Sequence, residues 1–386
     1  MASKKNLLLI KGGEVHDAVR KEGYIADILA EDGRIVKIGE GLDKPRNAKV
    51  FDAAGLRVYP GFVEAHCHIG LDGYAVGYEG KDYNEHNDSC TPQLRAIDSI
   101  NPQDPTFRMA ALAGVTTVCT GPGSANVLGG TFACIKTTGD RVEKMIVRDP
   151  VAMKCAFGEN PKRVYRDKCI SARMTVAAKL REMLFKAKEY KEKKEAAGED
   201  PSKKPAFDMK LEALIPVLKG EIPLKAHAHR ADDIFTAIRI AKEFGVKLTL
   251  DHVTDGSLIA ADLAEEGYPL AVGPSLTHAT KVELTNKSFR TAGDLSKAGA
   301  SVSIITDSPV IPEQYLPLCA GLAVKDGMDP FEALKAVTIN AAKHIGVEDR
   351  VGSIEAGTDA DFVICDGDPL ESATVVKAVF INGERV

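Results

Sequence analysis

The sequence predicts an α/β protein: a (β/α)8 barrel of the TIM type with a small β-sandwich domain built from both chain ends. From about Val58 to Arg350, short β-branched runs alternate with helical stretches, which is typical of βα units around a parallel sheet. Eight such runs can be counted, the number that a closed barrel needs, and a barrel takes about 250 residues before insertions. Both ends of the chain are rich in strands instead.

The expected strands follow the chain in order. In the N-terminal region they are Leu7–Lys11, Tyr24–Ala30 and Ile35–Ile38, separated by turns that contain glycine. In the barrel they are Val58–Ala65, Val115–Thr120, Ala133–Thr137, Val151–Phe157, Ile222–His227, Lys247–His252, Pro269–Pro274 and Ser301–Thr306. In the C-terminal region they are Ala360–Cys365 and Val375–Ile381, followed by the hairpin signal Asn382-Gly383.

These strands predict two domains, a β-sandwich of residues 1–56 and 350–386 and a barrel of residues 57–349. An open, doubly wound sheet is the competing fold. It usually has a glycine-rich phosphate turn after its first strand, whereas Val58–Ala65 is followed by histidines. The barrel is therefore the favoured prediction.

Composition narrows the class of function. The chain has 386 residues, with 50 Lys+Arg against 55 Asp+Glu and a formal charge of −5, which argues against nucleic-acid or membrane-surface partners. Its 8 cysteines include no Cys-x-x-Cys pair, so we expect reduced, mostly buried thiols. The apolar run Leu7–Ile10 is too short for a signal peptide or a membrane span, and we expect a cytoplasmic protein.

Histidines and an aspartate follow four of the expected barrel strands, at the ends where a barrel builds its active site. They are His66 and His68, His227, His252 and Asp307. Because side chains alternate along a strand, the spacing of His66 and His68 points both imidazoles to one face. Neutral imidazoles and a carboxylate are the usual ligands of zinc or a similar divalent ion. Asp307 alone could merely cap a turn, but the whole set indicates a metal site.

Several segments together resemble the amidohydrolase superfamily. They are Pro60–His68, Gly114–Val118, the strand-end histidines, Asp307 and Gly352–Phe362, which follow one another in the order typical of that superfamily over nearly the whole chain. Within it, the chain is most similar to the branch of imidazolonepropionase-like and prolidase-like enzymes. The resemblance implies a metal-dependent hydrolase with a small-molecule substrate, forming homo-oligomers, in which His66, His68, His227, His252 and Asp307 bind metal or water.

The resemblance leaves open whether the site holds one ion or two. In two-metal members, a lysine on the fourth strand carries a carboxylate and bridges the ions, and Lys154 lies at that place in Val151–Phe157. Alternation puts Lys154 on one face with two alanines, which leave room for a long side chain. Lys154 could instead reach solvent or pair with Glu159. In a two-metal site, His66, His68 and Asp307 would hold one ion, and His227 and His252 the other.

Substrate-binding candidates lie beyond the same strand ends. A deaminase of this superfamily, or imidazolonepropionase, would be expected to have a glutamate three residues after His227, where this chain has Arg230. Arg230 either grips a substrate carboxylate or pairs outward with a neighbouring aspartate. The other candidates are His229, His278, and Asn160, Arg163 and Tyr165 of the loop after the fourth strand. We expect His16, His86 and His344 to be structural or surface residues.

The hypothesis from the sequence is hydrolysis of an amide-type C–N bond by metal-activated water, with Zn²⁺ as the first expectation for the metal. His252 and Asp307 form the catalytic set, and Asp307 passes the proton of the water to the leaving nitrogen. Substrates would be N-acyl amino acids, dipeptides or cyclic amides. The alternatives are imidazolonepropionase-like or deaminase activity on a heterocycle with one metal, and a catalytically silent binding homologue.

Overall fold

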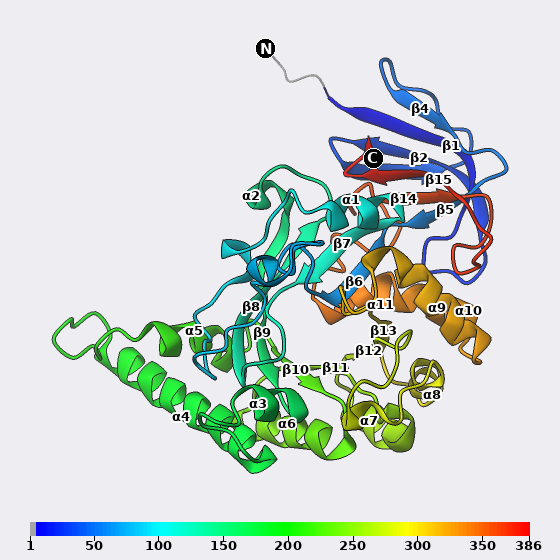
Figure 1. Ribbon diagram of the computed structural model, residues 1–386. Helices are drawn as coiled ribbons and strands as arrows, with labels where there is room; N and C mark the ends of the chain where they lie inside the picture. Colours follow the sequence, from blue (N-terminus) through cyan, green and yellow to red (C-terminus); the bar gives the residue numbers. More distant parts are fainter. Residues whose placement is uncertain (1–4) are drawn as a thin grey trace.

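Residues 5–386 of the computed structural model form two sheets, each of eight strands (Figure 1). The first sheet combines both ends of the chain. Its strands are β1 (Leu7–Val15), β2 (Tyr24–Glu31), β3 (Arg34–Gly39), β4 (Lys49–Asp52), β5 (Arg57–Pro60), β14 (Phe362–Cys365), β15 (Val376–Ile381) and β16 (Glu384–Arg385). Strand β14 pairs antiparallel with β5, which joins the C-terminal strands to the N-terminal ones. The domain limits 1–56, 57–349 and 350–386 stay a prediction.

The second sheet is the barrel. Its strands follow one another in chain order from β6 to β13, and all eight of the predicted runs contribute to it. They are β6 (Phe62–Cys67), β7 (Val115–Thr120), β8 (Leu128–Lys136), β9 (Ile146–Ala156), β10 (Leu224–Ala228), β11 (Leu248–His252), β12 (Leu270–Val272) and β13 (Val302–Ile304). The almost closed barrel and the separate β-rich region confirm the predicted fold class.

Strand β4 was not predicted, and β8 and β9 begin five residues earlier than predicted, at Leu128 and Ile146. Two further details differ from the prediction. The run Val58–Ala65 is divided between β5 and β6, because the backbone passes from one sheet to the other at Gly61: Gly61 N donates to Asp361 O, and Phe62 N donates to Gly114 O. Strand β8 runs antiparallel to β7 and β9, whereas the pattern predicted a parallel sheet. The reason is connection length: parallel neighbours need a crossover of a dozen or more residues, and only residues 121–127 join β7 to β8.

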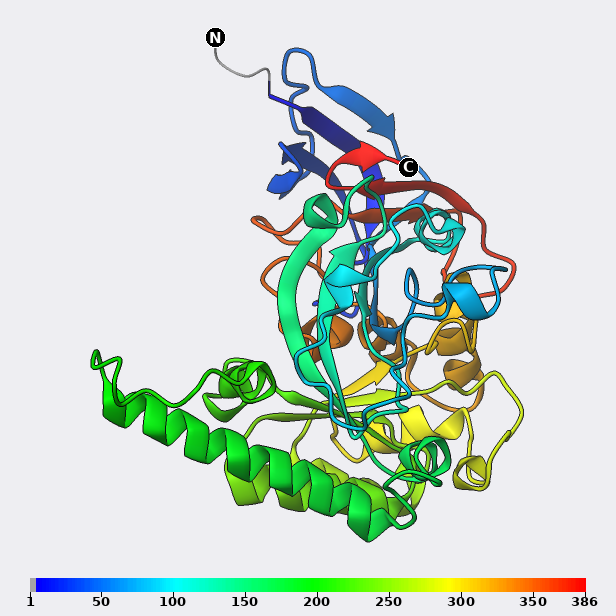
Figure 2. The ribbon, with the colours of Figure 1, turned by 60° about the vertical axis from the view of Figure 1, so that its left-hand side comes forward.

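The helices lie outside the barrel strands (Figure 2). They are α1 (Pro105–Leu112), α2 (Val142–Met145), α3 (Glu159–Val164), α4 (Arg173–Ala197), α5 (Met209–Leu218), α6 (Ala231–Phe244), α7 (Ala260–Glu266), α8 (Arg290–Lys297), α9 (Leu316–Lys325), α10 (Pro330–Ala336) and α11 (Ile339–His344). Figure 2 shows α4 as the longest, running along one side of the molecule. Within residues 5–386, no helix combines the length and apolar character needed to cross a membrane.

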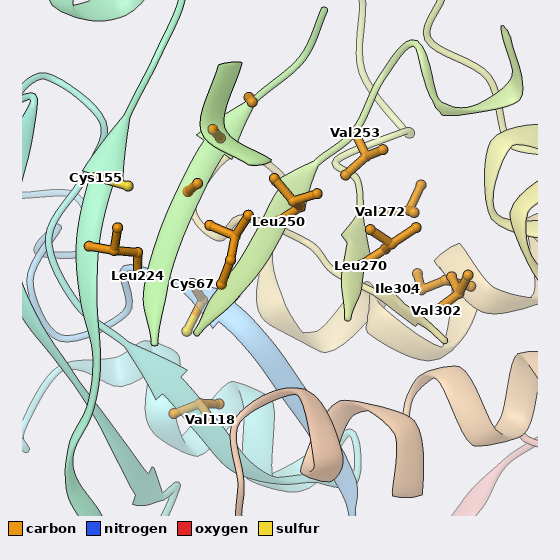
Figure 3. Packing of buried hydrophobic residues seen from close by; sticks show 14 of the residues in the cluster. Cys67, Val118, Cys155, Leu224, Leu250, Val253, Leu270, Val272, Val302 and Ile304 are labelled. Atoms are coloured by element: carbon orange, nitrogen blue, oxygen red, sulfur yellow. The ribbon is translucent and has the colours of Figure 1, made fainter. Parts of the chain in front are cut away.

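Apolar side chains of neighbouring strands pack together and leave the alternate positions for polar groups. Leu250, Leu270 and Val302 are register partners on β11, β12 and β13, and all are buried in one cluster (Figure 3). The next residue on β11 is Asp251, which alternation turns to the opposite face. The strands thus carry an apolar face toward the helices and a polar face toward the middle of the barrel. All 8 cysteines are free thiols, and Cys169 alone among them is exposed.

Candidate metal centre

The predicted ligands other than Lys154 meet at the floor of one cavity. Its volume is about 720 Å³, and its lining includes His66, His68, His227, His229, His252 and Asp307. These residues come from the ends of β6, β10 and β11 and from the segment after β13. All are buried or nearly so: Asp307 is the most exposed, with 15% of its side chain accessible.

The ligand atoms form two sets that share one residue. His66, His252 and Asp307 form one set, and His227, His229 and His252 form the other, each with its atoms within 4.8 Å of one another. The Nε2 atoms of His66 and His68 lie 3.4 and 3.1 Å from Asp307 Oδ1. His252 therefore stands between two places where an ion could be held.

The protonation states suit ligation. Burial lowers the pKa of both His66 and His252 to about 4 and holds those of His227 and His229 well below their usual range. Burial opposes ionisation of Asp307, but His252 and the hydrogen-bonding histidines outweigh it and keep its pKa well below the ordinary value. Neutral imidazoles and an ionised carboxylate are the forms that donate electron pairs to a cation.

The orientation of the imidazole rings also suits metal binding. His68, His229 and His252 each use Nδ1 for a contact of 2.7 to 2.8 Å, with Gly121 O, Thr254 Oγ1 and Gly273 O respectively. Their Nε2 atoms remain for the cavity, the arrangement that outer partners impose on metal-binding histidines. The buried Nε2 of His252 has no hydrogen-bond partner within residues 5–386. A buried polar atom without a partner is costly, and a divalent ion would satisfy it, so these residues fit a metal.

The backbone at two of the ligands is held in an uncommon conformation. His252 has φ of 77° and Asp307 has φ of 53°, both in the left-handed region that non-glycine residues rarely adopt. Such strain persists where the surrounding structure imposes it, often at functional sites. Both side chains, His252 at the end of β11 and Asp307 in the segment after β13, line the cavity.

Lys154, on strand β9, lies beneath the histidines of the cavity. It is fully buried, and its Nζ lies 3.4 Å from His66 Nε2 and 3.7 Å from Asp251 Oδ2. Burial lowers the pKa of Lys154 to about 8, against the opposing effect of Asp251. The alternative contacts expected from the sequence, with solvent or Glu159, do not occur in the structure: the side chain is 0% exposed and its ion pair is with Asp251.

Of the substrate-binding candidates, the structure brings three to the cavity and leaves three away from it. His229, Asn160 and Arg163 line the cavity. Arg230 lies outside it and forms a two-pronged pair with Asp232, at 3.0 and 2.9 Å. Tyr165 is buried, with its hydroxyl 2.6 Å from Glu85 O and 2.9 Å from Asp88 O. His278 is exposed in the loop after β12.

Sequence reasoning missed a group of buried charges around the ligands. Asp251 faces His66 Nδ1 at 3.1 Å and pairs with Lys225 at 2.8 Å, while His344 Nε2 lies 3.5 Å from the same carboxylate. Burial opposes ionisation of Asp251, but Lys225 and His66 hold its pKa well below the usual value. A signal was present: Lys225 is two residues before His227, so alternation already places both on the inner face.

A second group that sequence reasoning missed links the end of β6, which carries His66, to the segment after β13, which carries Asp307. The Glu64 carboxylate accepts hydrogen bonds from His66 N at 2.9 Å, Thr306 N at 2.8 Å and Thr306 Oγ1 at 2.7 Å. No backbone ladder joins β6 to β13 within residues 5–386, so Glu64 supplies part of the closure. Glu313 lies beside it, fully buried, and no sequence pattern links the two.

Comparison with known proteins agrees with the fold described above and identifies the family of the chain. The profile of the amidohydrolase family matches residues 210–386. The crystal structure of an amidohydrolase from Thermotoga maritima MSB8 is 43% identical and superimposes with a TM-score of 0.95, covering 98% of this chain and 99% of the other.

Two curated relatives are more distant. Amidohydrolase tasK of Hapsidospora irregularis is 28% identical over 93% of this chain, which spans only 40% of the length of that relative. The imidazolonepropionase of Symbiobacterium thermophilum is 27% identical over 87% of this chain and 83% of its own. Together with the match to the Thermotoga protein over nearly its whole length, these similarities show that the chain belongs to the amidohydrolase family of hydrolases.

Proposed function

We propose that the protein hydrolyses an amide-type C–N bond in a small molecule, with a divalent metal held at the floor of the cavity. The observation that carries the proposal is the pair of ligand sets sharing His252, with Asp307 in one of them. Residues His66, His68, His227 and His252 would hold metal together with Asp307. A bound divalent ion, with Zn²⁺ as the first candidate, would supply a water of lowered pKa and polarise the scissile carbonyl.

Asp307 is the proton carrier in this proposal. Its carboxylate is held by the Nε2 atoms of His66 and His68 and kept ionised at neutral pH, so it can accept a proton from water. It lines the cavity and is the one carboxylate that does so within residues 5–386. The same group can then deliver the proton to the leaving nitrogen, which needs a proton to depart as an amine.

We also propose that Lys154 carries a carboxylate and bridges two ions. Support comes from its burial, its position 3.4 Å from His66 Nε2 and its lowered pKa, since only the neutral amine reacts with carbon dioxide. His66, His68 and Asp307 would then bind one ion, and His227 and His252 the other. His229 belongs by geometry to the second set, so it is either a ligand or a substrate-binding group.

The substrate would contact the wall above the histidines, where Asn160 and Arg163 line the cavity. N-acyl amino acids and dipeptides suit a wall that offers a guanidinium, and small cyclic amides are the other candidates. Arg230 and Tyr165 have partners elsewhere, so for these residues a contact with substrate would need a rearrangement of the rim.

The decisive measurement is the metal-to-chain ratio of protein purified without chelator, by elemental analysis. A ratio near two that falls in Lys154→Ala supports the bridging lysine, whereas a ratio near one makes Lys154 a structural residue. Asp307→Asn should keep a folded protein and cost several orders of magnitude in turnover across a panel of acyl amino acids, dipeptides and cyclic amides. Unchanged turnover in that variant would exclude the proton role.

A second candidate is imidazolonepropionase-like or deaminase chemistry on a heterocycle with one metal. The imidazolonepropionase relative favours it, whereas the arginine at position 230, where that chemistry needs a glutamate, argues against it. Ammonia release across a set of heterocycles, together with a metal ratio near one, would replace the first proposal by this one. A chain without metal and without activity on either panel would be a silent homologue.

A further inference from the structure

The wall of the cavity is cationic. Lys81, Arg163 and Lys281 line it, and within residues 5–386 no carboxylate does so except Asp307 at the floor. Lys81 already pairs with Asp72, at 3.3 Å and outside the cavity lining. The carboxylates that pair with Lys81 and Lys281, Asp72 and Glu283, do not line the cavity, so only the cations of these pairs face it. The three cations differ in how firmly they are held.

Lys281 is the most firmly held of the three. Its Nζ lies 2.6 Å from Glu283 Oε1 and donates a hydrogen bond of 3.1 Å to Asn160 Oδ1. Its side chain is only 17% exposed, against 49% for that of Lys81. An ammonium group has three N–H donors, so Lys281 can keep both contacts and still donate to a ligand in the cavity that it lines.

Glu283 makes this arrangement rigid. It is fully buried in the short helical turn Val282–Leu284 of the loop after β12, and its Oε2 accepts a hydrogen bond of 2.9 Å from Glu159 N at the start of α3. Asn160, the other partner of Lys281, is the next residue of α3 and also donates to Ser124 Oγ at 2.8 Å. The loop and α3 are thus joined through the same side chains that fix the ammonium.

The position of Lys281 relates it to the histidines. Its partner atom Glu283 Oε1 lies 3.8 Å from His229 Nε2 and 4.0 Å from His227 Nε2. The ammonium and two histidines of the second ligand set therefore share Glu283 Oε1 as a neighbour. A cation placed in advance loses little conformational freedom when it binds a ligand, which is the advantage of a preorganised site.

We propose that Lys281 binds a carboxylate of the substrate, as a cation that Glu283 and Asn160 hold in place before the substrate arrives. The proposal rests on the proposed function, because it assigns a group of the substrate to this cavity. It selects substrates with a free carboxylate near the scissile bond over neutral cyclic amides. Arg163, which is exposed and has no ion pair within residues 5–386, is a second, more mobile contact for the same group.

The test compares ligands that differ only in charge. Binding of N-acetyl-L-amino acids and of their C-terminal amides to the metal-loaded protein is measured by calorimetry, and hydrolysis of the same compounds by chromatography. We expect at least one acid to bind about tenfold or more tightly than its amide, since hydrogen bonds to charged groups are the stronger ones. Lys281→Met should abolish this preference while leaving the metal content and the affinity for the amide unchanged.

Three variants separate charge from fold. Lys281→Arg should retain part of the preference, and Lys281→Gln, which keeps a donor but not the charge, should lose it even if Lys281→Met fails to fold. Lys162→Met removes a nearby charge of α3 that does not line the cavity and should change nothing.

The outcomes separate this inference from the proposed function. If no acid binds more tightly than its amide, or if the preference survives in Lys281→Gln, the role of Lys281 is wrong. Binding that depends on the carboxylate, without any hydrolysis, would count against the proposed function alone. Hydrolysis of amides and acids with equal efficiency and equal affinity would count against the role of Lys281 alone.

Discussion

A buried ion network between the barrel and the C-terminal strands gives a direct test of how the two sheets are held together. Lys136, the last residue of β8, places its Nζ 2.6 Å from Asp361 Oδ2 and 2.9 Å from Asp359 Oδ2, and none of the three side chains is more than 4% exposed. In Lys136→Met, Asp361 loses its ion pair, whereas Asp359 keeps Arg350 at 2.9 and 2.8 Å. Removing one partner of a buried pair costs about 3–5 kcal/mol.

This loss converts into a measurable shift of the melting temperature. Unfolding entropy is about 2.1 cal/mol/K per residue, so a chain of 386 residues has about 0.8 kcal/mol/K. The predicted decrease in Tm is therefore about 4–6 °C by scanning calorimetry at pH 7. Lys144→Met is the control, because Lys144 and Asp140 pair at 3.0 Å with 62% and 67% of their side chains exposed. It should lower Tm by less than about 1 °C.

The pH dependence supplies a second check with a definite sign. Burial works against ionisation of Asp359, but Arg350 and Lys136 outweigh it and hold its pKa below the ordinary value. Such a carboxyl stabilises the folded state above its unfolded pKa of about 3.9, and this contribution is lost as pH falls through the folded pKa. The difference in Tm between wild type and Lys136→Met should therefore shrink below about pH 4. A variant within about 1 °C of wild type at pH 7 would refute the reasoning.

The remaining predictions concern the groups around the metal centre. Asp251→Asn should weaken metal binding by about 10- to 100-fold in competition with a chromogenic chelator, because the partner of His66 Nδ1 is altered; an unchanged affinity would mean that Asp251 serves only the core. Burial and the neighbouring Glu64 raise the pKa of Glu313 well above its usual value, so its carboxyl group is neutral and Glu313→Gln should have a Tm near that of wild type. Glu64→Gln places an amide where three donors need an acceptor, and its Tm should be several degrees lower. Chelator treatment should lower Tm by about 3 °C if the ion is present at 100 times its Kd, and an unchanged Tm would count against a resident metal.

The barrel could be predicted from the sequence because its signal is local. Each β-branched run is short and bounded by helical stretches, so the eight strands and the ligands at their ends follow from periodicity and position. The direction of β8 could not be predicted in the same way, because a strand has the same pattern in both directions. The prediction placed this strand at Ala133–Thr137, which leaves residues 121–132 for a parallel crossover. The connection is short only because β8 begins at Leu128 in the structure.

The metal ligands were easier to predict than their supports for a similar reason. His66, His227 and His252 are recognisable by residue type at strand ends. Glu283 and Lys281 lie in a loop without periodicity, and their roles can be recognised only from their contacts with α3. The formation of homo-oligomers, which the resemblance to the amidohydrolase superfamily implies, stays a prediction.

The two buried lysines of the inner core show why Lys154, rather than Lys225, suits a modified role. Both ammonium groups lie over the ring of Phe132, at 5.5 and 5.6 Å from its centroid, and one carboxylate, Asp251, serves both. That carboxylate is 2.8 Å from Lys225 and 3.7 Å from Lys154, so Lys225 has the close partner. A second buried cation without a close partner is costly unless it loses its proton. Lys154 is therefore the lysine whose amine is available, and it is also the one that lies 3.4 Å from His66 Nε2. Addition of carbon dioxide to that neutral amine, with release of one proton, would give a carbamate that carries the negative charge two divalent ions need between them.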